Sequence, residues 1–247
     1  MLVAENITKF YGKQLVLNNI NLTINAADFT VIMGPSGSGK STLLNILAAI
    51  DTATQGRIIF EQQELFQLST KKIDTLRQKN MSFIFQEYHL LNTLTCKENI
   101  ALPLTIQKQQ QHEISQKILQ IAETLSIRDI LSKYPNTISG GEKQRVAVAR
   151  ALITHPKIIF ADEPTGALDS KNAYELLKIL EKSNAEDKQT IVLVTHDPFT
   201  ASFAKKILFI KDGNIYHTLE RGTLNRKSFF EQIIQMTSMM GGNYNVI

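Results

Sequence analysis

The chain has 247 residues, of which 43% are hydrophobic, so it is long enough to bury a core without covalent cross-links and too apolar to be disordered. Its formal net charge of +4, from 27 Lys and Arg against 23 Asp and Glu, is too small to argue for nucleic acid as the main ligand. The single cysteine excludes an internal disulfide, and no signal-peptide pattern or apolar run of the ~20 residues that cross a bilayer is found, so we expect a cytoplasmic protein that reaches a membrane only through a partner.

The N-terminal part of the chain has the pattern of strands followed by a helix. Val3 to Phe10 and Val16 to Ile24 are predicted to be strands joined by a turn, because apolar residues alternate along them. Thr30 to Met33 is a short apolar run typical of a buried strand. A helix is predicted from Lys40 to Ile50. The glycine-rich segment between that last strand and this helix therefore lies in a strand, loop and helix order.

That segment fits the phosphate-binding pattern G-x-x-x-x-G-K-[ST] in every position. Glycines let backbone N–H groups approach phosphate oxygens closely, and the following helix adds its N-terminal dipole. We therefore expect Lys40 to contact the β- and γ-phosphates of a nucleotide and Ser41 to ligate Mg²⁺. The loop alone does not distinguish a kinase, a GTPase and a motor protein. The predicted phosphate-binding residues are Gly34, Pro35, Ser36, Gly37, Ser38, Gly39, Lys40, Ser41 and Thr42.

The middle of the chain becomes helical after two further predicted strands, Ile58 to Phe60 and Met81 to Phe85. Gln86 follows the second strand, where it could ligate Mg²⁺ or the attacking water, or be an ordinary polar residue. The polar run 107–111 is predicted to be an exposed loop. Apolar residues then recur at helical spacing from His112 to Ile127, which predicts a helix.

A second helix of this region is predicted to begin at an N-cap, Ser139, followed by Gly140 and Gly141. A helix N-terminus built from a serine and two glycines can bind an anion. It would be a second anion site, and a single ATP is not expected to touch both sites within one chain. Taken in isolation, the same residues are an ordinary capped helix.

Two strands of the C-terminal part end in residues suited to hydrolysis. Ile158 to Ala161 is an apolar strand followed by Asp162 and Glu163, and charges at the end of a buried strand need a partner. We expect Asp162 to hold Mg²⁺ through a water and Glu163 to take a proton from the attacking water. Ile191 to Val194 is a second such strand, and His196 after it is expected to contact the γ-phosphate. The alternatives are a surface acidic pair and an ordinary loop histidine.

The remaining patterns complete an α/β chain. A helix is predicted from Ala173 to Ser183, a hairpin from Ile207 to Tyr216, and a terminal helix from Ser228 to Met240. We therefore predict a doubly wound α/β core that carries a helical insertion. The apolar residues of the terminal helix that we expect to pack on this core are Phe229, Phe230, Ile233 and Ile234.

The stretch from Ile138 to Ala151 resembles the signature motif of ATP-binding cassette ATPases. The resemblance covers nearly the whole chain, because the other motifs follow in the order of that family. It implies an ATPase of two copies arranged head to tail, in which Ser139, Gly140 and Gly141 of one copy close over the γ-phosphate held by the other. None of the departures from the family pattern removes a phosphate-contacting group. These departures are Ile138, Glu142 and Ala167.

The resemblance also implies roles for single residues. Tyr11 matches the aromatic residue that stacks on adenine, Gln86 matches the residue of the Q-loop, and His196 matches the switch histidine. Asp169 lies in the stretch that matches the D-loop and is expected to contribute to nucleotide binding. The implied cofactors are ATP and Mg²⁺, and the implied catalytic residues are Glu163, His196 and Gln86. The implied metal ligands are Ser41, Gln86 and Asp162.

The implied fold is α/β, a P-loop NTPase core with an N-terminal antiparallel β-subdomain and a helical subdomain insertion. We expect one nucleotide-binding domain over residues 1–247. Residues 1–86 and 157–225 would form the ATP-binding core and the β-subdomain. Residues 87–156 would form the helical subdomain with the signature motif, and residues 226–247 a C-terminal helix and tail.

Four stretches, 85–95, 98–104, 139–142 and 161–169, resemble the macrolide-exporter and lipoprotein-release subgroup of the family. Toward the C-terminus, Arg221-Gly222, Phe229-Phe230 and Gly241-Gly242 resemble the bacitracin-type branch, which confers resistance to antimicrobial peptides. The resemblance implies an integral membrane permease as partner, at the cytoplasmic face of the cell membrane. Tyr88 to Asn99 is the segment that we expect to contact the permease, unless its apolar residues belong to the core.

Other classes of nucleotide-binding protein remain as alternatives. Cassette ATPases of DNA repair usually carry long coiled coils between their nucleotide motifs, and those of translation carry two cassettes in one chain. The sequence shows neither pattern, so we expect no nucleic acid partner. A GTPase would need the guanine-binding pattern Asn-Lys-x-Asp, which the sequence lacks.

Overall fold

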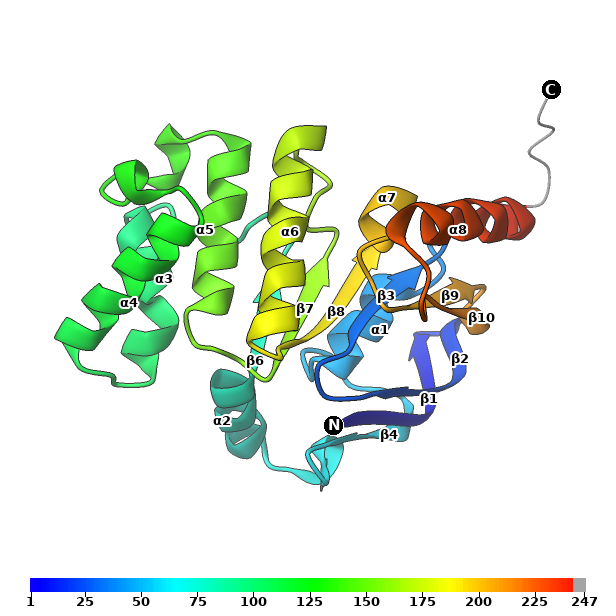
Figure 1. Ribbon diagram of the computed structural model, residues 1–247. Coiled ribbons are helices and arrows are strands. Elements are labelled where there is room, and N and C mark those ends of the chain that lie inside the picture. Colours follow the sequence, from blue (N-terminus) through cyan, green and yellow to red (C-terminus); the bar gives the residue numbers. More distant parts are fainter. Residues whose placement is uncertain (242–247) are drawn as a thin grey trace.

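The computed structural model describes residues 1–241, and its strands form two sheets. Figure 1 shows helices α3, α4 and α5 gathered at one end of the molecule and strands β1, β2 and β4 at the other. The strands are β1 Leu2–Tyr11, β2 Gln14–Ile24, β3 Phe29–Met33, β4 Gln55–Phe60, β5 Gln63–Glu64, β6 Met81–Ile84, β7 Ile158–Asp162, β8 Thr190–Thr195, β9 Lys206–Lys211 and β10 Asn214–Glu220. The α-helices are α1 Lys40–Leu47, α2 Thr70–Asn80, α3 Cys96–Ile106, α4 Gln111–Thr124, α5 Gly140–Leu152, α6 Ser170–Glu186, α7 Pro198–Ala201 and α8 Arg226–Gly241.

The larger sheet has the strand order β10-β9-β3-β8-β7-β6. Its strands run parallel except β10, which pairs antiparallel with β9 at one edge. Every residue of β3 and β8 is buried, which is typical of parallel strands covered on both faces. Alternate side chains enter two hydrophobic cores, so Val31 packs with residues of α3 to α6, while Ile32 packs with α1 and the smaller sheet.

The smaller sheet, in the order β2-β1-β4-β5, is antiparallel throughout. Leu2, Ala4 and Ile7 of β1 are buried, whereas Phe10 and Tyr11 at the end of the strand are exposed. The sheet packs with α1 in one core and lies on one side of the larger sheet. This packing brings the end of β1 next to the segment that follows α1. The predicted antiparallel β-subdomain, P-loop core and helical insertion are therefore confirmed.

Two predicted helices end earlier than expected. The helix predicted to reach Ile50 is wrong at its C-terminal end, because α1 stops at Leu47. Ala49 has a left-handed φ of 52°, and the N–H of Ile50 donates to the Asn45 carbonyl at 2.9 Å, the hydrogen-bond pattern of a Schellman cap. The helix predicted in the middle of the chain also ends early, at Thr124.

Three helices, α2, α3 and the four-residue α7, were not predicted from the sequence. α2 buries none of its residues, so it has no apolar periodicity to detect. α3 contains Pro103 in its interior, a residue that normally argues against a helix. The predicted exposed loop 107–111 is only partly correct. Gln111 begins α4, and Gln107 donates to the Gln78 carbonyl at 2.7 Å, which ties the loop to α2.

The C-terminal helix α8 lies beside α7 and packs on the larger core (Figure 1). Phe229 and Ile233 are fully buried, as predicted. Phe230 is half-buried and Ile234 is 43% exposed, so the predicted packing holds for one side of the helix only. Gly242, which contributed to the resemblance to the bacitracin-type branch, lies outside the described residues, as does the rest of the tail.

Candidate functional site

The phosphate loop connects β3 to the N-terminus of α1. Gly39 is the N-cap of α1 and has a left-handed φ of 96°, and a Cβ there would lie 2.8 Å from the Val16 carbonyl oxygen. A Cβ on Gly34 would overlap the Ile210 carbonyl oxygen. No side chain caps α1, and its first turn contains no acidic residue. The N-terminus of α1 is thus left open for an anion.

Lys40 lies inside this loop with its side chain nearly buried. Its Nζ donates to the Pro35 carbonyl at 2.8 Å. Burial lowers the pKa of Lys40, against the opposing effect of Glu163 and Asp162. The buried hydroxyl of Ser38 has no hydrogen-bond partner among the described residues. An ammonium held on a carbonyl and an orphaned hydroxyl both fit a loop that binds phosphate oxygens.

A hydroxyl and a carboxylate meet where a divalent cation is expected. Ser41 Oγ donates to Asp162 Oδ1 at 3.1 Å, which joins the start of α1 to the end of β7. Burial raises the pKa of Asp162, and Glu163 adds to that rise. Oxygen ligands of this kind suit Mg²⁺ bound together with nucleotide phosphates. Within residues 1–241 no group of three or more His, Cys, Asp or Glu side chains could hold a metal ion by itself.

The two predicted hydrolytic residues are neighbours. β7 and β8 are adjacent parallel strands, so Glu163 and His196 emerge at the same edge of the sheet. His196 Nδ1 lies 2.9 Å from Glu163 Oε1. Glu163 has a left-handed φ of 42°, and its N–H donates to the Val194 carbonyl at 2.9 Å, which supports this backbone conformation.

Gln86 lies across Gly166 from this pair. A Cβ on Gly166 would be 3.6 Å from both Gln86 Nε2 and Glu163 Oε2. A cavity of about 570 Å³ is lined by Gln86, Glu163 and His196 among others. The three predicted catalytic residues are therefore brought together around one space that could hold a water molecule.

The signature turn is a separate, internally capped helix end. Ser139 Oγ accepts a hydrogen bond from the Glu142 N–H at 3.3 Å, and the Ser139 N–H donates to Glu142 Oε2 at 2.7 Å. Hydrogen bonds that the Ser139 backbone N–H and side chain donate to its carboxylate lower the pKa of Glu142. Figure 1 shows α5 in the helical part of the molecule, apart from α1 and the phosphate loop. The structure thus does not bring this turn and the phosphate loop together within one chain.

Two other predicted residues have partners in their own chain. The Asp169 carboxylate caps α6 by accepting from the Asn172 N–H at 2.9 Å, and Asn172 also accepts from Arg145 of α5 at 2.8 Å. The Tyr11 hydroxyl donates to Asp51 Oδ2 at 2.6 Å, while the residue as a whole is 51% exposed.

One residue near the site was missed by the sequence analysis. Arg150 of α5 donates to the Tyr88 and His89 carbonyls at 2.7 and 2.6 Å. Tyr88 and His89 both have left-handed backbone conformations, with φ of 61° and 45°, and follow closely after Gln86. Burial lowers the pKa of Arg150. No local sequence pattern predicts these hydrogen bonds from Arg150, because they join residues about sixty positions apart.

None of the helices in residues 1–241 is both long and apolar enough to cross a bilayer.

Comparison with known proteins extends this geometry. A family model described as ABC transporter matches residues 17–166. The chain is 49% identical to the bacitracin export ATP-binding protein BceA of Halalkalibacterium halodurans, over 99% of this chain and 98% of that protein. It is 44% identical to the macrolide export ATP-binding/permease protein MacB of Campylobacter jejuni, over 87% of this chain and 33% of that protein. Among solved structures, it resembles a dimeric post-hydrolysis state of the ATP-binding cassette MJ0796 of Methanocaldococcus jannaschii bound to ADP and Pi, with a TM-score of 0.84 and 38% identity over 89% of this chain and 98% of that one.

Proposed function

The chain belongs to the ABC transporter family of ATPases, and from that premise we propose that two copies close around two Mg-ATP and drive a membrane permease. Dimeric structures of a 38% identical cassette support the association of two copies. The observation that carries the proposal is the separation of two anion-binding helix ends, at Lys40 and at Ser139, in one chain. An ATP held at the first end can meet the second end only in another copy.

Nucleotide binding begins at the phosphate loop in this proposal. The N-terminus of α1 directs its N–H groups and dipole at the β- and γ-phosphates. Lys40 exchanges the Pro35 carbonyl for phosphate oxygens, which compensate the burial of its charge. Bound Mg²⁺ would neutralise phosphate charge, and Ser41, Gln86 and Asp162 are the residues proposed to hold it.

Hydrolysis is assigned to the pair at the end of β7 and β8. Glu163 takes a proton from the attacking water, and His196, 2.9 Å from its carboxylate, holds that carboxylate in place. Gln86 on the other side of Gly166 orients the same water. All three residues lie on one cavity, so a water molecule can be held within reach of the base.

Closure of the dimer is assigned to the signature turn. The Ser139 Oγ accepts a hydrogen bond from the Glu142 N–H, and we propose that its hydroxyl hydrogen turns from the Glu142 carboxylate to the γ-phosphate of the other copy. Gly140 and Gly141 let the backbone approach that phosphate closely. Asp169 is proposed to act through its cap on α6, which holds Asn172 against Arg145 of the signature helix. Cleavage of the γ-phosphate removes the shared ligand, and the dimer reopens.

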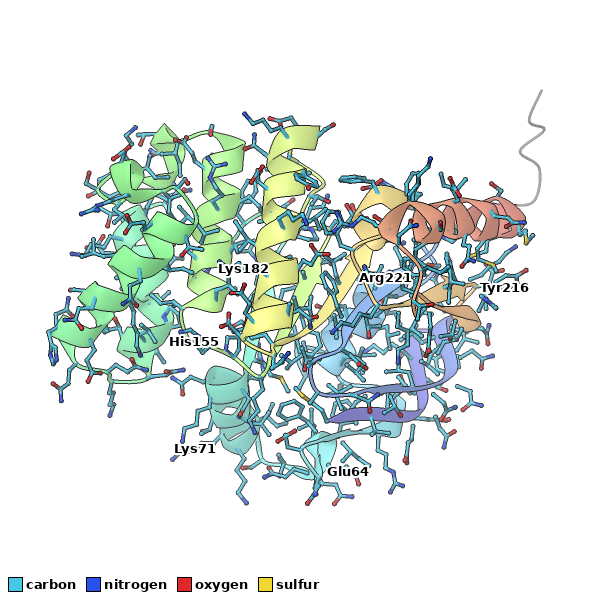
Figure 2. The ribbon with its side chains drawn as sticks, viewed as in Figure 1. Glu64, Lys71, His155, Lys182, Tyr216 and Arg221 are labelled. Carbon is cyan, nitrogen blue, oxygen red and sulfur yellow. The ribbon has the colours of Figure 1, made fainter. Side chains whose placement is uncertain are left out.

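The permease is proposed to dock in a groove beside the helical subdomain. This groove, of about 870 Å³, lies between α2, α3, β6 and the C-terminal end of α5. Its floor includes Phe83 and Phe85, stacked with centroids 4.2 Å apart, and one wall includes Ile106, which is 56% exposed. Lys71 on its rim projects outward from α2 (Figure 2). An amphipathic segment of a permease fits such a surface.

Part of the segment predicted from the sequence to contact the permease, Tyr88 to Asn99, is buried and cannot be reached by a partner. His89 lies on the groove and Leu91 is 46% exposed, so the first half of the segment can be reached by a partner. Cys96 and Asn99 are fully buried and belong to the core. The proposed division of the chain remains an ATP-binding core over 1–86 and 157–225, a helical subdomain over 87–156, and a C-terminal helix and tail over 226–247.

The transported or resisted compound is proposed to be a bacitracin-type antimicrobial peptide. Support comes from the 49% identity with a protein named for bacitracin export, which covers nearly all of both chains. The macrolide export relative is matched over a third of its length only, and macrolide export or lipoprotein release is the alternative. In either case the chain would work at the cytoplasmic face of the cell membrane, held there by the permease.

Replacement of Glu163 by Gln tests the composite site. We expect ATP binding to persist, hydrolysis to fall by at least about 100-fold, and a dimer to accumulate in Mg-ATP, because general base catalysis is lost while the phosphate contacts remain. Phosphate release and sedimentation measure the two effects. A variant that stays monomeric at saturating Mg-ATP would contradict the composite site.

Replacement of Ile106 by Asp tests the groove. We expect the purified chain to hydrolyse ATP as before but to lose copurification with its co-expressed permease, because a charge is placed on the apolar wall. Leu119→Asp on α4 is the matched control, since Leu119 is similarly exposed and lies outside the groove. Equal copurification of both variants would show that the groove is not the docking site.

A further inference from the structure

Three side chains form a compact group where β1 meets the segment after α1. Asp51 accepts hydrogen bonds from Lys9 Nζ at 2.7 Å, from the Tyr11 hydroxyl at 2.6 Å and from the Thr52 N–H at 2.7 Å. Lys9 Nζ also donates to the Thr52 carbonyl at 2.7 Å. The Lys9 side chain is 10% exposed, so this is a largely buried ion pair and not a surface contact. We call Lys9, Tyr11 and Asp51 the tyrosine triad.

The triad leaves one face of the Tyr11 ring free. Lys9 Nζ lies 4.8 Å from the ring centroid and covers one face, yet the residue as a whole is 51% exposed. The hydrogen bond to Asp51 raises the pKa of the Tyr11 phenol, and the hydroxyl of Thr42 opposes that rise. Thr42 is the last residue of the phosphate loop, so Tyr11 lies next to that loop.

Asp51 is itself fixed relative to the phosphate loop. It follows the Schellman cap of α1, and its N–H donates to the Asn45 carbonyl at 3.2 Å. The same helix begins at Lys40 of the loop. One short helix therefore carries phosphate contacts at its N-terminus and the carboxylate that holds Tyr11 at its C-terminus.

We propose that Lys9 and Asp51 are positioning residues that hold the Tyr11 ring as a preorganised stacking platform for the purine of ATP. The inference rests on the proposed function in one respect, that the ligand of the phosphate loop is ATP. An exposed tyrosine without these contacts would sample several rotamers and would lose that freedom on binding. The ion pair and the hydroxyl hydrogen bond remove that cost before the nucleotide arrives. The ammonium on the far face also leaves only one face for a base.

The test separates the base from the phosphates. Binding of Mg-ATP and of inorganic tripolyphosphate is measured by calorimetry for the wild-type chain, Tyr11→Phe, Asp51→Asn and Lys9→Met. Tyr11→Phe keeps the ring and removes only its tether. We expect each variant to bind ATP about three- to tenfold more weakly, as expected for one lost orienting contact, and tripolyphosphate as tightly as the wild type. In turnover, KM for ATP rises while kcat stays unchanged.

Glu5→Gln is the matched control, because Glu5 pairs with Arg57 on the same small sheet but away from the triad. It should bind both ligands as the wild type does. ATP affinity unchanged in Tyr11→Phe and Asp51→Asn would overturn the proposal, and so would an equal loss of affinity for ATP and tripolyphosphate, which would show a structural role. A wild-type chain that binds tripolyphosphate but not ATP would instead contradict the proposed function.

Discussion

The two helix N-termini of the proposed composite site differ in whether side chains of their own chain cap them. α1 starts at Gly39 without a side-chain cap and without an acidic residue in its first turn. α5 starts at Ser139 with a complete capping box, in which the Glu142 carboxylate already accepts the Ser139 N–H. The N-terminal N–H groups of α1 therefore lack a side-chain partner until a phosphate binds, whereas the N-terminus of α5 is capped by its own chain before a second copy binds.

This difference suits a site that must open and close. In the proposed site, free N–H groups, a glycine cap and the desolvated Lys40 suit α1 to hold the triphosphate throughout the cycle. At α5 the γ-phosphate of another copy competes with a carboxylate of the chain itself, which weakens the contact between copies. A weaker second contact can be broken when the γ-phosphate is cleaved. The following changes test this division, from the largest effect to the smallest.

Lys40→Ala should have the largest effect, because it removes the charged contact of the phosphate loop at the N-terminus of α1. We expect affinity for Mg-ATP to fall by about 100-fold in the isolated chain, because a charge-assisted contact to two phosphates is lost. Fluorescence titration with a labelled nucleotide measures this. Lys72→Ala on the exposed face of α2 is the control and should bind as the wild type does. Unchanged affinity in Lys40→Ala would contradict the assignment of the phosphate loop.

Ser139→Ala should act only when two copies meet. In a Glu163→Gln background we expect ATP-driven dimerisation to weaken by about tenfold, the usual effect of losing one hydrogen bond to a charged group. Nucleotide affinity of the monomer should not change, because the turn is not part of the phosphate loop of its own chain. Sedimentation at several protein concentrations gives the dimer constant. A loss of monomer affinity would show that the two ends are not independent.

Glu142→Gln should have the opposite effect from Ser139→Ala on ATP-driven dimerisation. The amide oxygen can still accept the Ser139 N–H, but the negative charge next to the γ-phosphate is gone. We expect the dissociation constant of the ATP-bound dimer to fall about two- to fivefold, the order expected when one repulsive charge is removed from a solvated site. The same sedimentation assay applies. A weaker dimer would mean that the carboxylate supports closure and does not oppose it.

The pH dependence of unfolding checks that Glu142→Gln leaves the cap in place. The folded pKa of Glu142 is lowered from 4.5, so the stability added by its charge is complete above pH 4.5 and is lost as the pH falls through the lower folded value. The wild type should therefore exceed the variant in stability above that pH and approach it below.

Much of the site could be predicted from short stretches of sequence. The phosphate loop, the Ser139 cap and the carboxylates after β7 were all expected, because each depends on a few neighbouring residues whose backbone requirements are local. The strand order then placed Glu163 and His196 side by side, as two parallel strands ending at one edge imply. α2 and α3 were missed because one lacks an apolar face and the other contains Pro103.

The residue types that handle phosphate and water were thus determined by the sequence itself, since glycine conformations, helix caps and strand ends are local properties of a chain. The tertiary structure alone decided which distant residues support them. Asp51 reaches Tyr11 across about forty positions, and Arg150 reaches His89 across about sixty. Such contacts depend on how sheets and helices pack, and no periodicity along the chain encodes that packing.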